Sequence, residues 1–206
     1  MATEPRCEDC APPNPFPKDV TPVPTPRAPF ESADTVNLIV ALLVRFPELS
    51  SLRSRPAVGQ ITLSYAIAGA LSAEEQSGAS ASLVDHIRAF LDFGDEPLQK
   101  LSVRCEVDQT LSFVHVTRDV NSFSREELSL QVALLTERFS ERLVKNETPD
   151  ESIDDDPAAR DELVEYAIDS MRDPAQQKSV VGFREEKRVL VYFLKAGKNG
   201  KARARS

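Results

Sequence analysis

The chain has 206 residues, of which 41% are hydrophobic, and its formal net charge is −8. This length accommodates one domain with tails, and the acidic balance argues against general binding of nucleic acid, whose phosphates it repels. Three cysteines do not make a disulfide framework, and no secretory signal is recognisable. The longest strictly apolar run, residues 38–44, is too short to span a membrane, so we expect a cytoplasmic protein without membrane contact.

Residues 1–30 contain nine of the fifteen prolines, which predicts a disordered N-terminal tail. Within it, Cys7 and Cys10 form a CxxC pair, the weak candidate for a metal site. Structural zinc needs four ligands, and a redox pair needs a helix that the following prolines prevent. We therefore expect neither a metal nor another cofactor, and leave open a half-site that a partner or a second copy completes.

The sequence pattern in the first half of the folded region predicts a helix, a strand and a second helix. Apolar residues recur at helical spacing from Ser32 to Phe46, and alternate along a strand from about Val58 to Ala68. Ser72 and Glu75 are spaced as a capping box that starts the second helix. The poor helix formers at 77–80 predict a break within it.

Two further strands and a helix follow. Alternation predicts strands at 101–107 and 111–116, with Cys105 among the core residues. Ser124 and Glu127 have capping-box spacing, which predicts a helix from Ser124 onward.

Residues 146–156 are predicted to form an acidic linker, and 195–206 a disordered basic tail. Pro157 is expected in the first turn of a helix, whose apolar side is Leu163, Tyr166, Ala167 and Met171. A hairpin follows with arms at 180–183 and 189–194. The second arm is apolar on both faces, which predicts a strand that is central in the sheet or covered on both sides.

This order predicts the α+β class, with helices packed on an antiparallel or mixed sheet. Residues 31–145 would form the core, and residues 157–194 would complete the same domain. The order β-α-β-β-α followed by a closing strand from the hairpin matches the ferredoxin-like arrangement, with one extra helix before it.

No catalytic or phosphate-binding motif is present, so the main hypothesis is a non-enzymatic binding or regulatory module that acts through a protein partner or self-association. The sheet face, the first helix or the tails would bind the partner. Because the apolar residues of the first helix exceed one face, Leu38, Leu42 and Phe46 are the candidate interaction residues.

Two alternatives remain open. One is an RNA- or ribosome-associated factor that uses the basic tail, whose cations are Lys195, Lys198, Lys201, Arg203 and Arg205. The other is an enzyme that uses carboxylates or His115. A pocket that holds His86 or His115 beside a carboxylate would favour the enzyme.

Overall fold

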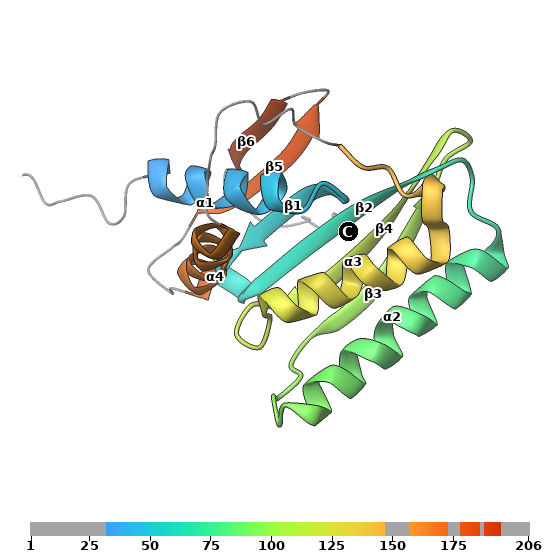
Figure 1. The fold of residues 1–206 in the computed structure, drawn as a ribbon, viewed down its shortest axis with the longest axis horizontal. Coiled ribbons are helices and arrows are strands. Elements are labelled where there is room, and N and C mark those ends of the chain that lie inside the picture. Colours follow the sequence, from blue (N-terminus) through green and yellow to red (C-terminus); the bar gives the residue numbers. More distant parts are fainter. Residues whose placement is uncertain (1–31, 147–156, 173–177, 186–187, 195–206) are drawn as a thin grey trace, which may run out of the picture.

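The computed structural model describes residues 32–146, 157–172, 178–185 and 188–194 (Figure 1). The predicted tails 1–30 and 195–206, and nearly all of the predicted linker, lie outside these residues. The described elements, in chain order, are α1 (Ser32–Arg45), β1 (Leu49–Arg55), the 3-10 turn η1 (Pro56–Val58), β2 (Gln60–Ala68), α2 (Ala73–Phe93), β3 (Leu101–Val107), β4 (Leu111–Asp119), α3 (Arg125–Phe139), the 3-10 turn η2 (Ser140–Arg142), α4 (Pro157–Arg172), β5 (Ser179–Glu185) and β6 (Arg188–Leu194).

The strands form one sheet in the order β3-β4-β2-β1-β5-β6, in which every neighbouring pair is antiparallel. The four helices lie on one side of it, with α2 and α3 over the β3–β2 half and α1 and α4 over the rest (Figure 1). This confirms the predicted α+β class. The other face of the described sheet carries no helix, and we call it the open face.

The ferredoxin-like order is present only in part. β2, β3 and β4 form the expected split β-α-β arrangement, with β4 between the other two. The place beside β2 that the closing strand would occupy is taken by β1, which precedes β2 in the chain. The C-terminal hairpin pairs instead with β1, through β5. The sequence interpretation missed β1 because its residues, LSSLRSR, lack an apolar alternation.

Helix α2 begins at the predicted capping box, since Ser72 accepts from the Glu75 amide and Glu75 accepts from the Ser72 amide. The predicted break at 77–80 is wrong, because α2 is continuous. Ala79 is buried in the core, and a Cβ at Gly78 would overlap the guanidinium of Arg138 on α3. Packing against α3 therefore outweighs the weak helix propensity of this segment.

Helix α3 begins at Ser124 as predicted, where the hydroxyl accepts from the Glu127 amide at 3.2 Å. The Glu127 side chain does not complete a capping box. It is fully buried and accepts two bonds from Arg118, at 2.8 and 2.9 Å. A buried guanidinium requires a carboxylate partner, and this requirement decides the orientation of Glu127.

Arg118 organises a buried polar network between β4 and α3. Besides Glu127, its guanidinium donates to Asp119, to the carbonyl of Lys100 at 2.7 Å and to Ser122 at 3.0 Å. The network continues from Glu127 to Gln131, which accepts from the Tyr65 hydroxyl at 3.0 Å. Burial and the charge of Glu127 raise the pKa of Tyr65 well above its ordinary value, so its hydroxyl remains a donor.

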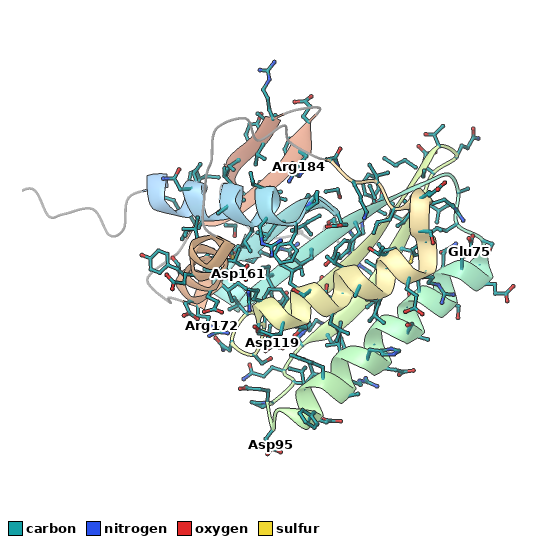
Figure 2. The ribbon with its side chains drawn as sticks, in the orientation of Figure 1. Glu75, Asp95, Asp119, Asp161, Arg172 and Arg184 are labelled. Atoms are coloured by element: carbon teal, nitrogen blue, oxygen red, sulfur yellow. The ribbon has the colours of Figure 1, made fainter. Side chains whose placement is uncertain are left out.

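Asp119 closes this network at the end of β4 (Figure 2). Burial opposes its charge, but bonds from Ser122 and the Lys100 amide, together with Arg118, hold the pKa of Asp119 below its ordinary value. Arg172 of α4 lies beside the same turn and donates to the carbonyls of Val120 and Phe123 (Figure 2). The turn thus fixes both α3 and α4.

Two predicted faces need correction. Of the residues assigned to the apolar side of α4, Ala167 and Met171 are buried, whereas Leu163 and Tyr166 are exposed. The buried stripe of α4 is Val164, Ala167, Ile168 and Met171, at spacings of three and four. The strand expected to be central or covered on both sides, β6, is an edge of the described sheet, and its Tyr192, Phe193 and Leu194 are exposed.

We expect Arg118→Met to destabilise the protein by about 3–5 kcal/mol, because it leaves the buried Glu127 without its cation. The double variant Arg118→Met, Glu127→Gln should recover part of this loss. Urea unfolding followed by circular dichroism measures both. Arg104→Met, at an exposed arginine of β3, is the control, and an equal loss in the control would contradict the assigned role of Arg118.

We expect Gly182→Ala to cost about 1–3 kcal/mol, because a Cβ on β5 would overlap Ile39 and lie 3.1 Å from Leu43 of α1. Gly78→Ala is the matched comparison. Its Cβ meets only the end of the flexible Arg138 side chain, and alanine favours the helix by about 1 kcal/mol. Thermal unfolding should separate the two variants, and similar melting temperatures would contradict close packing of α1 on β5.

Candidate functional site: a cationic groove on the open sheet face

The open face of the sheet contains a groove of about 370 Å³. We call it the cationic groove. Its lining comes from β1, β2, β3, β4 and β5, with Lys100 just before β3: Ser51, Arg53, Arg55, Thr62, Ser64, Lys100, Ser102, Arg104, Glu106, His115, Thr117 and Val181.

Strand alternation places these residues on the open face. On β1, Leu52 and Ser54 are buried towards the helices, so Arg53 and Arg55 project to the opposite side. On β4, the buried Val114 and Val116 alternate with His115 in the same way. Each strand therefore supplies the core with one set of side chains and the groove with the other.

The pairing register arranges the lining in two rows across the sheet. The first row runs Ser51, Ser64, His115, Arg104, and the second runs Arg53, Thr62, Thr117, Ser102. Directly paired side chains on one face lie about 4.5–5.5 Å apart, so each row forms a continuous polar track. The hydroxyls of Thr62 and Thr117 are 3.1 Å apart within the second row.

The groove is positive although the chain is acidic. Its lining has four cations, Arg53, Arg55, Lys100 and Arg104, and one carboxylate, Glu106. The whole chain has a net charge of −8. Low-dielectric walls focus the field of clustered charges, so the groove attracts anions that the rest of the surface repels.

His115 lies at the centre of the groove between a hydroxyl and a carboxylate. Its Nδ1 is 2.9 Å from Ser64 Oγ, and its Nε2 is 3.5 Å from Glu106 Oε2. The ring also stacks on Phe113, with centroids 6.0 Å apart. Hydroxyl, imidazole and carboxylate are the groups of a hydrolytic triad, although the two ring nitrogens are exchanged relative to the Ser-His-Asp arrangement. A histidine beside a carboxylate in a pocket is the arrangement expected above for an enzyme.

Beyond Val181, the open face becomes apolar. On β5 and β6 the rings of Phe183 and Tyr192 stack with centroids 5.7 Å apart, and Leu190 is paired with Phe183. The open face therefore has a cationic half over β1–β4 and an apolar half over β5–β6.

The residues of the first helix that were predicted to bind a partner do not lie on the surface. Leu38, Leu42 and Phe46 are all buried in the core between α1 and the sheet. Their side chains fill the core, while Val44 of the same helix is 38% exposed, so we place the interaction surface elsewhere. The apolar excess of α1 is explained by its contacts with both the sheet and α4.

The other predicted residues divide into two groups. His86 is exposed on α2 and bonds the carbonyl of Ser82, while Cys105 is a free thiol packed against the core. The pair Cys7 and Cys10 and the five cations of the basic tail lie outside the described residues. No group of three metal-ligating side chains occurs in the part of the chain that the structure describes.

The sequence interpretation did not predict β1, and it therefore missed Arg53 and Arg55. The available signal was the turn that follows them: Pro56 starts it, and Gly59, with a φ of 58°, ends it in the left-handed region. A turn at the start of the predicted strand 58–68 indicates that a partner strand precedes it. That strand would alternate Leu52 and Ser54 with the two arginines.

Comparison with family models, with curated proteins and with solved structures found no match to this chain. Among the described helices, none combines the length and apolar character needed to cross a bilayer.

Proposed function

We propose that the protein is a non-enzymatic binding module that holds a carboxylate-rich segment of a protein partner in the cationic groove. The observation that carries this proposal is the excess of four cations over one carboxylate on an open sheet face of an acidic chain. Successive residues of each strand alternate between the core and the groove, so the groove rests on a packed core. A rigid groove can bind a partner without rearranging.

The spacing of the cations fits an extended acidic segment. Arg53 and Arg55 project from the same face of β1, two residues and therefore about 7 Å apart. Alternate side chains of an extended peptide have the same separation, so acids at every second position can pair with both arginines. Guanidinium groups bind carboxylates in a bidentate manner, and hydroxyls such as those of Thr62 and Thr117 can bind the remaining oxygens.

RNA is the competing anion, and the composition of the groove favours carboxylates over it. The lining contains no Phe, Tyr or Trp, and its one ring, His115, is already stacked on Phe113. Single-stranded binding uses aromatic side chains as platforms for bases. The net charge of −8 also opposes a phosphate backbone outside the groove.

The arrangement of Ser64, His115 and Glu106 favours a second candidate, an enzyme that hydrolyses an anionic ester. Two features argue for binding instead. Glu106 is 78% exposed, so water competes for its bond with His115. Ser64 lies in a central strand paired on both sides, where ladder bonds occupy the backbone amides that would stabilise an oxyanion.

A cytoplasmic location belongs to the same proposal. Cys105 is a free thiol, as expected in a reducing compartment.

We expect a fluorescent glutamate-rich peptide to bind the wild-type protein in about 50 mM salt, and binding to weaken as salt screens the charges. Arg53→Glu should weaken binding at least about tenfold, because it replaces an attraction with a repulsion at the groove. Fluorescence anisotropy measures both effects.

The matched control is Arg88→Glu on the exposed face of α2, which changes the net charge equally away from the groove. It should change peptide affinity much less. Equal weakening by the two variants would contradict a local site. Binding of single-stranded RNA in place of the peptide, lost in Arg53→Glu, would assign the groove to nucleic acid.

We expect wild-type protein and Ser64→Ala to hydrolyse p-nitrophenyl acetate at the same background rate, because β2 is paired on both sides and its backbone amides are engaged in the sheet. The measurement is the release of p-nitrophenolate over time. A rate that falls to the buffer level in Ser64→Ala, with the fold retained, would establish the hydrolytic candidate and displace the binding proposal.

A further inference from the structure

His115 is the one histidine in the lining of the cationic groove, and each of its ring nitrogens faces a partner. Nδ1 lies 2.9 Å from the hydroxyl of Ser64 on β2, and Nε2 lies 3.5 Å from the carboxylate of Glu106 on β3. The imidazole side chain is 21% exposed, so a segment bound in the groove would lie against it. Histidine is the type of side chain whose charge changes between about pH 5 and 8. The lining therefore includes a group that gains a positive charge as the pH falls.

The charged groups that face His115 both come from β3. Arg104 is its direct partner in the sheet register and opposes a positive charge on the ring, whereas Glu106 favours one. On the other side β2 presents the uncharged Ser64, and along β4 the ring stacks on Phe113. The helices lie on the opposite side of the sheet. The remaining cations of the groove come from β1, two places away in the strand order, and from the residue before β3.

A proton on His115 changes which atoms donate in these hydrogen bonds. In a neutral imidazole one nitrogen donates and the other accepts. The Glu106 carboxylate can only accept, so it favours the N–H on Nε2, and Nδ1 then accepts from the Ser64 hydroxyl. In the charged ring both nitrogens donate, so Ser64 becomes the acceptor and its own O–H is released to the groove that it lines. Protonation thus supplies a positive charge and a hydroxyl donor, and both stabilise a bound carboxylate.

We infer that protonation of His115 strengthens the binding of carboxylates, so that the cationic groove holds an acidic segment more tightly as the pH falls from about 8 to about 6. This inference rests on the proposed function, because it concerns regulation of the same groove. Bound carboxylates would offset the repulsion between Arg104 and the charged ring. Since a ligand that prefers the charged ring also increases the fraction of rings that are charged, binding should take up protons.

The test measures the affinity of the full chain for the glutamate-rich peptide, labelled with a pH-insensitive dye, at about pH 6 and about pH 8 in about 50 mM salt. By fluorescence anisotropy, the wild type should bind at least about threefold more tightly at the lower pH, because one charge is added beside the bound carboxylates. His115→Gln has a side chain that does not titrate and should bind with the same affinity at both pH values.

Proton uptake is a second readout, and for the wild type it needs no variant. Isothermal titration calorimetry at about pH 7, in two buffers with different ionisation enthalpies, measures the protons taken up when the peptide binds. The wild type should take up protons, and His115→Gln should take up none. Binding by the wild type without proton uptake would overturn the inference.

His86→Gln is the matched control, because the chain has two histidines and His86 is exposed on α2, outside the groove. It should keep the wild-type ratio of affinities. A ratio that His115→Gln also keeps, with its fold verified by circular dichroism, would overturn the inference. Equal affinity of the wild type at both pH values would overturn this inference alone, whereas a peptide that binds at neither pH would overturn the proposed function as well.

Discussion

The buried Arg118 is the constraint on which the arrangement of this protein depends. A guanidinium with no exposed surface must have its donors satisfied, and here they are satisfied by Glu127 at the start of α3, by Asp119 and Ser122 in the turn after β4, and by the carbonyl before β3. One side chain thus fixes the end of β4, the start of β3 and the direction of α3. Arg172 then fastens α4 to the same turn. Removal of one partner leaves an uncompensated buried charge, so it costs more than the intact pair contributes.

The network and the described helices all lie on one side of the sheet, and this leaves the other side uncovered by helices. All the described helices pack on one face, so every strand presents its alternate residues on the open face. A face without helices must tolerate water, and on β1–β4 it consists of hydroxyls, arginines and His115. The same alternation that fills the core with Leu52, Leu63 and Val116 therefore produces the two polar rows of the groove.

The sequence predicted the elements that carry a strong local signal and missed those decided by tertiary partners. Ser72 and Ser124 marked two helix starts because a cap is a local interaction. β1 was not predicted because its open face is polar and because its partner β5 is distant in the sequence. Glu127 fitted a capping box by spacing, but only the folded core reveals that Arg118 needs its carboxylate. β6 was predicted to be central or covered because it is apolar on both faces, but its place in the strand order depends on which strand the hairpin pairs with. The site was predictable only as a sheet face, since its arginines come from the missed strand.

The two halves of the open face differ in the kind of contact they can make. Arginine and lysine remain hydrated until a carboxylate displaces their water, so the half over β1–β4 is stable when empty. The half over β5–β6 exposes Tyr192 and Leu194, so a contact there would bury apolar surface rather than neutralise charge.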